Sequence, residues 1–258
     1  MIGAEEGRRR DVRKRLLLGL GGVLVIAALW QGTIFAYELP LVVLPSPWRV
    51  IEALLTLVRT SAFWKDVGVS LMEFAGGYLI GGVLGIAAGL LLAESRSARM
   101  TATPVVEALR FVVPFAWIPL TVLWFGTSYL GKLVLVAYAV FFVMLVSTAR
   151  SIGQVEPTLS RVGTMLGMGR WQLAMRVHLR AAAPSIASAA RAAAAIGWIA
   201  VVAAEYVGAS AGLGVMITNA ATSLATPVVI AGMIVIGGVG AAVSAVVRWL
   251  SRAWLDYR

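Results

Sequence analysis

Residues 69–93 read VSLMEFAGGYLIGGVLGIAAGLLLA, a stretch in which Glu73 is the only charged residue. An α-helix that crosses the hydrocarbon core of a bilayer needs about 20 mostly apolar residues. The long apolar stretches of the chain lack period-two alternation, which is the pattern of a membrane β-barrel. Six stretches are long and apolar enough to span a membrane: 16–37, 69–93, 104–125, 130–149, 185–207 and 227–249. The sequence therefore predicts an all-α, polytopic membrane protein with six transmembrane helices.

The overall composition points to the same class of protein. Of the 258 residues, 60% are hydrophobic and 13% are charged, against about 25% charged in a typical soluble domain. A soluble domain of this size has too small an interior to bury so much apolar surface. This excludes an ordinary cytosolic enzyme and a disordered chain. The absence of cysteine excludes a disulfide scaffold. The net charge of +10 favours contact with anionic lipid over binding to nucleic acid.

The Lys and Arg residues are distributed unevenly between the two sides of the predicted spans. The tail 1–15, the 94–103 loop, the 150–184 loop and the C-terminus hold sixteen of the 22, whereas the opposite side holds four. Cytoplasmic loops of membrane proteins carry an excess of Lys and Arg. We therefore expect both termini in the cytoplasm, residues 1–15 as a basic tail, and residues 16–258 as a single transmembrane domain.

The 150–184 loop is the longest connection and lies on the predicted cytoplasmic side. Pro157 suits the first position of a helix. Four apolar residues then recur at helical spacing: Leu159, Val162, Met165 and Leu166. Long connections are uncommon unless they are functional or disordered. We expect a short amphipathic helix here, which either lies on lipid headgroups or docks a cytoplasmic partner.

The chain lacks the motifs of an enzyme or of an ATPase. Residues 126–132 come close to a phosphate-binding loop, but Leu133 stands where Ser or Thr must reach Mg²⁺. The one histidine, His178, falls in the cytoplasmic connection, where we expect a solvated side chain. A polytopic protein without an energy-coupling site of its own is a passive pore, an ion-driven carrier or one subunit of a larger machine.

Charged residues inside the predicted spans fall near helix ends. Arg110 and Arg191 are six or seven residues from the cytoplasmic ends, within reach of the interface by snorkelling. Glu73 and Glu205 are near the outer ends, and for Glu205 a functional and an interfacial role stay equally open. Ion-driven carriers usually carry charges near the midplane, so this distribution disfavours a proton relay.

The third predicted span contains two prolines, Pro114 and Pro119. Each removes a backbone donor and crowds the carbonyl four residues earlier, here those of Arg110 and Phe115. Such carbonyls are tolerated at membrane depth where protein or a water-filled cavity satisfies them. A kinked helix with Trp117 nearby suits a translocation pathway, and a packed kink is the alternative.

A glycine stripe follows the second predicted span. Gly77, Gly81, Gly85 and Gly89 repeat every four residues. Stripes of small residues let another helix backbone approach closely. The stripe predicts a helix-packing face, with its partner in this chain or in another.

Several segments, in order from about residue 30 to the C-terminus, resemble the permease subunits of nitrate/sulfonate/taurine-type ATP-binding-cassette importers. The matching segments are Leu44-Pro45-Ser46-Pro47, Arg110 through Pro114, Trp117-Ile118-Pro119-Leu120, Trp124-Phe125-Gly126, and Ala204-Glu205 with Gly212-Leu213-Gly214. The resemblance implies a type I importer permease fold in the bacterial inner membrane. It also implies a second permease subunit in a homodimer or heterodimer, two ATPase subunits, and an extracytoplasmic substrate-binding protein.

The loop 150–184 matches part of a motif of this family: Glu-Ala-Ala, three residues, Gly, nine residues, an apolar residue, any residue, Leu and Pro. Gly167, Val177 and Leu179 match at the required spacings. Arg161-Val162-Gly163 stand in place of Glu-Ala-Ala, and Arg180 in place of the proline. In the family this helix docks in a groove of the ATPase and transmits its closure.

The resemblance therefore implies an ATPase-coupling helix over about Glu156 to Trp171. Gly163 and Gly167 would share one bare helix face for close docking, with apolar residues as anchors. The expected coupling residues are Glu156, Leu159, Arg161, Val162, Gly163, Leu166, Gly167 and Arg170. The expected pathway residues are Arg110, Pro114, Trp117, Pro119 and Glu205.

By this resemblance the chain is a non-catalytic permease that binds no cofactor or metal itself. ATP and Mg²⁺ would bind to the partner ATPase subunits. The transported solute would be small, such as a sulfonate, nitrate, an aromatic acid or a vitamin-like compound. The alternative is a passive channel or membrane scaffold without ATPase coupling.

Overall fold

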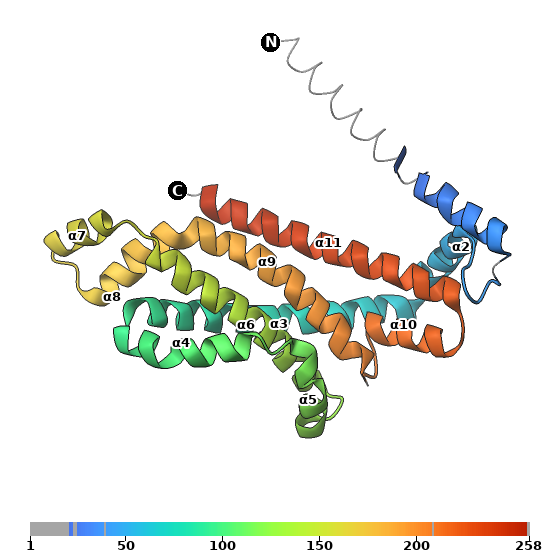
Figure 1. The fold of residues 1–258 in the computed structure, drawn as a ribbon, viewed down its shortest axis with the longest axis horizontal. Helices are drawn as coiled ribbons and strands as arrows, with labels where there is room; N and C mark the ends of the chain where they lie inside the picture. The colour runs from blue at the N-terminus through green and yellow to red at the C-terminus, as the bar shows by residue number, and fades with distance from the viewer. Residues whose placement is uncertain (1–20, 23–24, 39, 208, 257–258) are drawn as a thin grey trace, which may run out of the picture.

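The computed structural model describes residues 21–22, 25–38, 40–207 and 209–256, and these ranges contain helices and no strand. The named helices are α2 (Pro47–Val58), α3 (Ser61–Glu94), α4 (Arg96–Arg110), α5 (Ile118–Phe125), α6 (Tyr129–Gly153), α7 (Pro157–Met165), α8 (Arg170–Leu173), α9 (Leu179–Tyr206), α10 (Leu213–Thr222) and α11 (Thr226–Asp256). In Figure 1, α3, α6, α9 and α11 form an elongated bundle. The predicted all-α, polytopic membrane fold is confirmed.

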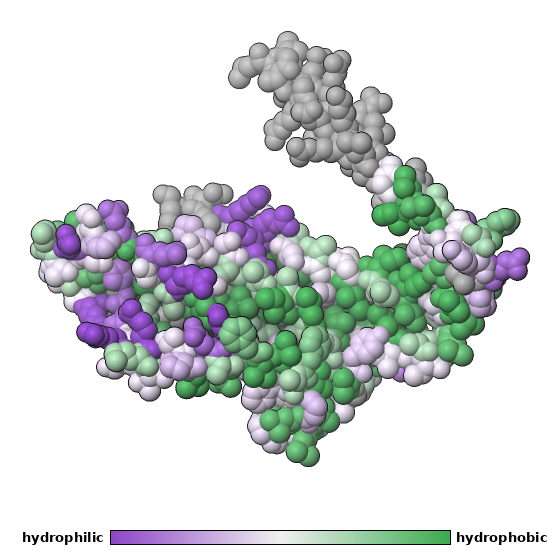
Figure 2. Space-filling model, viewed as in Figure 1, coloured by the Kyte–Doolittle hydropathy of each residue, from purple (hydrophilic) through white to green (hydrophobic). Residues whose placement is uncertain are grey.

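Four helical segments are long and apolar enough to cross a membrane: Ser61–Glu94, Tyr129–Gly153, Arg170–Tyr206 and Thr226–Arg252. The third of these joins α8 to α9 through a π-helical turn, Ala174–His178. Figure 2 shows apolar residues across the middle of the molecule and hydrophilic residues gathered at the end that carries α7 and α8. An apolar middle beside a polar end is the surface that a bilayer-spanning bundle requires.

The third predicted span, 104–125, is not one helix. α4 ends at Arg110, and the segment Pro114–Phe125 continues at an angle of 88°. Val113 is extended, with ψ at 142°, because a following proline disfavours the helical conformation. Pro114 then begins a short 3-10 helix that leads into α5. The first proline therefore ends the helix instead of bending it, and the expectation of one helix over 104–125 is wrong.

The first predicted span, 16–37, lies partly outside the described residues. Within them, Val25–Tyr37 forms a short apolar helix. Counting the bent pair around Pro114 as one span gives up to five candidate spans in the part of the chain that is described. The six-helix count and the cytoplasmic side of both termini stay predictions, and the basic tail 1–15 lies outside the described residues.

The glycine stripe of α3 lies against α6 of the same chain. A Cβ atom added at Gly77 would come within 2.5 Å of the Val136 Cβ, and one at Gly81 would meet the Ala137 carbonyl oxygen. Gly85 and Gly89 meet α6 in the same way. The two backbones therefore approach at a distance that admits no side chain, as small-residue stripes allow in membranes.

Trp198 connects three helices of the bundle. Its indole N–H donates to the Ile236 carbonyl on α11 at 3.1 Å. Its ring packs edge-on against Phe74 of α3, with the centroids 6.0 Å apart. Indole N–H groups usually find a partner when buried, and this one ties α9 to α11. The core between α3, α6 and α9 is thereby closed on the α11 side.

Candidate functional site

α7 lies at the hydrophilic end of the bundle, inside the predicted coupling loop (Figure 1). Pro157 occupies its first turn and Glu156 precedes it as the N-cap. Four apolar side chains there are exposed: Leu159 (45%), Val162 (49%), Met165 (85%) and Leu166 (71%). Arg161 is exposed on the same helix. Grouped apolar side chains on a polar surface mark an interaction site.

The end of α7 is a glycine cap. Gly167 has a positive φ of 77°, a conformation that glycine adopts without strain. The Met168 N–H donates to the Gly163 carbonyl at 3.1 Å, and the Gly167 N–H donates to the Thr164 carbonyl at 3.0 Å. These two bonds satisfy carbonyls that the helix end would leave open, as in a Schellman motif. Gly167 thus suits the position that ends α7.

This cap corrects the predicted extent of the coupling helix. The helix runs from Pro157 to Met165 and not to Trp171, so Leu166, Gly167 and Arg170 lie beyond its end. Gly163 is buried and faces Leu173, whereas a Cβ at Gly167 would meet open space. The expected bare face shared by the two glycines is therefore wrong.

His178 and Arg170 hold this region to the end of α3. His178 Nδ1 pairs with the Glu94 carboxylate at 2.5 Å, and its Nε2 lies 2.8 Å from the Ser160 hydroxyl of α7. The Arg170 guanidinium donates to the Glu94 carbonyl. The expectation of a solvated His178 is wrong: the ring links α7 to the bundle. Glu94 and Ser160 are far from His178 in the sequence, so no local pattern indicated the link.

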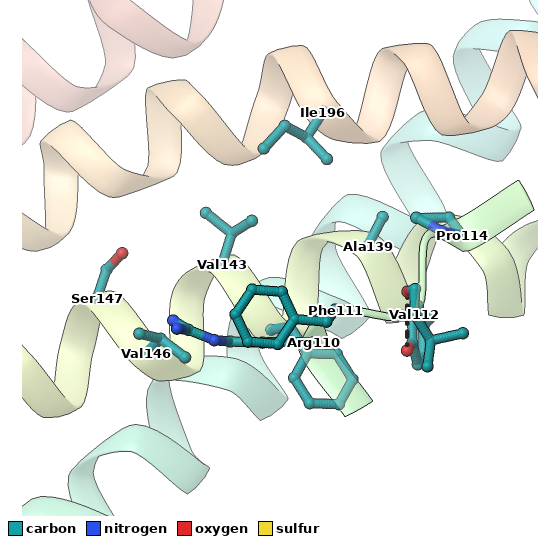
Figure 3. A pocket seen from close by; sticks show the side chains of 11 residues that line it. Arg110, Phe111, Val112, Pro114, Ala139, Val143, Val146, Ser147 and Ile196 are labelled. Atoms are coloured by element: carbon teal, nitrogen blue, oxygen red, sulfur yellow. Dashed lines mark hydrogen bonds between the residues drawn. The ribbon is translucent and has the colours of Figure 1, made fainter. Parts of the chain in front are cut away.

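A cavity lies beside the break after α4. Its volume is about 460 Å³, and segment 110–114, α6 and Ile196 of α9 line it. Figure 3 shows the guanidinium of Arg110 on the side of the cavity where Val146 and Ser147 lie, and Pro114 on the opposite side. Arg110 is the one charged residue of this lining. The cavity is an apolar chamber with a single cation.

Tyr138 of α6 satisfies carbonyls at the break. Its hydroxyl donates to the Leu109 carbonyl at 2.6 Å and to the Val112 carbonyl at 3.2 Å. The Trp117 ring packs against the Tyr138 ring, with centroids 5.3 Å apart. Protein groups therefore satisfy part of the backbone that the prolines disturb, as membrane depth requires. Tyr138 was not predicted, because the sequence does not show which side chain faces the break.

Arg110 also lines a second cavity of about 220 Å³, nearer the end that carries α7. Its lining holds two further arginines, Arg99 and Arg150, and one carboxylate, Glu107. Both cavities also share Val146. Arg110 thus lines both cavities: it is the one charged residue of the first, and one of three arginines in the second.

At the opposite end of the bundle, buried polar groups hold the start of α10. Glu205 of α9 accepts hydrogen bonds from the Ser70 hydroxyl and from the Gly214 N–H, the latter at 2.7 Å. The Leu213 N–H donates to Ser70 Oγ, and the Gly212 N–H donates to Asp66, both at 3.0 Å. The first N–H groups of a helix have no partner within it and favour negative charge. The Glu205, Ser70 and Asp66 side chains supply these hydrogen-bond partners, and two of the three are carboxylates.

An ion pair completes this set of buried polar groups, which we call the α10 network. Lys132 of α6 pairs with Glu73 of α3, and both residues are buried, as is Glu205 at 1% exposed. A Cβ at Gly214 would lie 2.8 Å from the Glu205 Cβ, and one at Gly212 would collide with the Glu205 carboxylate. The Gly212-Leu213-Gly214 motif is therefore needed for α10 to approach Glu205.

The structure separates the five predicted pathway residues. Arg110 and Pro114 line the first cavity, and Pro119 lines a different, apolar one of about 630 Å³. Trp117 packs on Tyr138, and Glu205 belongs to the α10 network. Ser70, Asp66 and Lys132 were missed. The Gly-Leu-Gly motif after Glu205 was the available signal, since it marks a close backbone approach.

Comparison with known proteins finds a protein family and several relatives that match this chain. Residues 81–256 match the family described as the binding-protein-dependent transport system inner membrane component. The "Putative aliphatic sulfonates transport permease protein SsuC" of Bacillus subtilis (strain 168) is 32% identical, with 99% of this chain and 93% of that protein covered. The taurine transport system permease protein TauC of Escherichia coli (strain K12) is 31% identical, with 88% and 85% covered.

Two further similarities extend the comparison. The bicarbonate transport system permease protein CmpB of Synechococcus elongatus is 28% identical, with 99% of both chains covered. A chain of a bacterial ABC transporter involved in the import of the acidic polysaccharide alginate has a TM-score of 0.62 at 17% identity. It covers 93% of this chain and 99% of its own length, which shows a shared fold.

The helical fold, the family match and the similar permeases together define the class of this protein. It is a multi-pass permease component of a bacterial inner-membrane importer. The chain belongs to the family of binding-protein-dependent transport system inner membrane components. The predicted resemblance to ABC importer permeases of the sulfonate and taurine type is confirmed.

Proposed function

We propose that this chain and a second permease subunit, in a homodimer or heterodimer, enclose the pathway of a small solute. ATP hydrolysis on two partner ATPase subunits drives transport, and an extracytoplasmic binding protein delivers the solute. The chain itself binds no cofactor and catalyses no reaction, while ATP and Mg²⁺ bind to the ATPase subunits. Relatives named for sulfonates, taurine and bicarbonate support a small solute.

The observation that carries the proposal is the exposed apolar surface around α7. Met165 is 85% exposed and Leu166 is 71% exposed, although they lie at the hydrophilic end of the molecule. Helices that dock into a groove present such anchors in helical register. The link through His178 to Glu94 gives a docked partner a rigid connection to α3. Closure of a pair of ATPases would then shift the permease between inward-open and outward-open states.

The test is a reconstituted complex with the ATPase subunits and binding protein of the same system. We expect Leu166→Asp to lower ATPase co-purification and ATP-driven uptake at least about tenfold, because a buried unpaired charge costs several kcal/mol. Leu166→Met, which keeps an apolar anchor, is the matched control and should retain both. Full uptake and ATP hydrolysis in Leu166→Asp would refute docking by α7. Uptake that proceeds without ATP would identify the alternative, a passive channel.

A further inference from the structure

The cavity beside the α4 break has the size and lining of a small-molecule site with one charged group. Its volume of about 460 Å³ falls within the range of roughly 300–1,000 Å³ common for such sites. Most of the lining is aliphatic or aromatic, and the polar side chains are Arg110, Tyr138 and Ser147. The Tyr138 hydroxyl already donates to backbone carbonyls. Arg110 is therefore the main recognition group of the cavity.

The guanidinium of Arg110 is in position to receive an anion. Neither of the two ion pairs among the described residues includes it. Its carbon lies over the Phe111 ring, 4.8 Å from the centroid, which is a cation–π contact. The guanidinium N–H groups match the oxygens of a carboxylate, sulfonate or phosphate.

Positive charge continues from Arg110 into the second cavity. Three arginines and one carboxylate line that cavity. Arg99 uses its donors on the carbonyls of Leu92 and Ala93 at the end of α3, whereas Arg150 lies in the last turn of α6. With three arginines against one carboxylate, the lining carries a net positive charge and attracts anions. An anion that leaves Arg110 would therefore be drawn toward Arg150.

We propose that Arg110 is a specificity-determining residue by which the permease itself selects a negatively charged solute, with Arg150 as the next contact. The inference rests on the proposed function, since it requires a solute in this cavity. It assigns the solute to the class of small organic anions whose apolar part contacts residues such as Phe142 and Val143. A lipid phosphate shares this chemistry, and the choice of nanodisc lipid in the experiment distinguishes the two sources.

The test uses the permease with its ATPase subunits in phosphatidylcholine nanodiscs. Saturation-transfer NMR titrations compare ethanesulfonate with dimethyl sulfone, a neutral molecule of similar size. We expect the native complex to prefer ethanesulfonate about tenfold or more, as charge-assisted hydrogen bonds allow. Arg110→Gln should abolish this preference, Arg110→Lys should keep part of it, and Arg150→Gln should lower it about twofold to threefold. Arg191→Gln is the matched control, because Arg191 lines neither cavity and instead donates to Ser251.

Two results would overturn the inference. One is a native complex without the preference, or an Arg110→Gln complex that keeps it within twofold while Arg110→Lys is folded and binds normally. The other is a preference that disappears in phosphatidylglycerol nanodiscs, because a headgroup would then occupy Arg110. Failure of ATP coupling in the Leu166 experiment would contradict the proposed function and leave this binding preference intact, so the two failures are distinguishable.

Discussion

At one end of the bundle, Glu205, Ser70 and Lys132 are buried and bonded to partners within the chain. At the other end, Met165 and Leu166 expose apolar side chains on a polar surface. The Glu205 end fixes α10 through its own side chains, whereas the proposed function assigns the exposed α7 surface to a partner protein. Variants in the α10 network should therefore affect folding, and variants of the exposed residues of α7 should affect coupling.

The largest expected effect on stability is at the buried ion pair. Lys132→Met leaves Glu73 buried without its cation, which should lower the free energy of unfolding by about 3–5 kcal/mol. Chemical unfolding in detergent measures this loss. The double variant Lys132→Met/Glu73→Gln removes both charges and should recover much of the stability. A Lys132→Met protein as stable as the native one would show that the pair does not stabilise this end of the bundle.

A smaller loss is expected where α3 meets α6. Gly81→Ala places a Cβ against the Ala137 carbonyl, and overpacking of this kind costs about 1–3 kcal/mol. Gly82→Ala is the matched control on the same helix, because a Cβ there meets nothing within 4 Å. Thermal unfolding of the two variants side by side measures the difference. Equal midpoints would contradict the close α3–α6 contact.

We expect an intermediate effect at His178, because this residue bonds within the chain and also holds α7 in place. His178→Ala removes its contacts with Glu94 and Ser160, with an expected loss of about 1 kcal/mol. Hydrogen exchange should become faster in α7 while α3 and α6 stay protected. ATP-driven uptake should fall together with this local protection. Unchanged exchange in α7 would show that the histidine link does not position the helix.

The smallest effect on stability is expected at α7 itself. Met165→Asp changes a side chain that is 85% exposed, so the free energy of unfolding should change by less than about 0.5 kcal/mol. The same variant should lose ATPase binding, which co-purification measures. A large loss of stability would mean that the chain itself, and not a partner, covers this side chain.

Local sequence patterns predicted the membrane helices because hydropathy is a property of each stretch alone. The spans 69–93, 130–149 and 227–249 fall within α3, α6 and α11, and the glycine stripe gave a packing face. The partner of that face could not be predicted, because the pairing of Gly81 with Ala137 depends on the fold.

The wrong predictions have the same cause: they concern features that depend on contacts between distant parts of the chain. Apolar spacing around 159–166 predicted a helix there, but glycine at 167 fits both a docking face and a helix end, and its positive φ decides for the end. Two prolines predicted a kink, while the 88° break depends on what packs against them. The α10 network joins Ser70 and Glu205, which are 135 positions apart in the sequence. The position of Glu205 near the end of its span could therefore not decide between a functional and an interfacial role.

The most direct test of ATPase coupling exploits the absence of cysteine from the chain. Met165→Cys introduces a single thiol on α7, and a short bifunctional reagent is applied to membranes containing the ATPase of the same system. We expect a cross-link between permease and ATPase, and none from Val83→Cys on the exposed middle of α3. Labelling of Met165→Cys by a membrane-impermeant reagent added outside intact cells, without a cross-link to the ATPase, would contradict it.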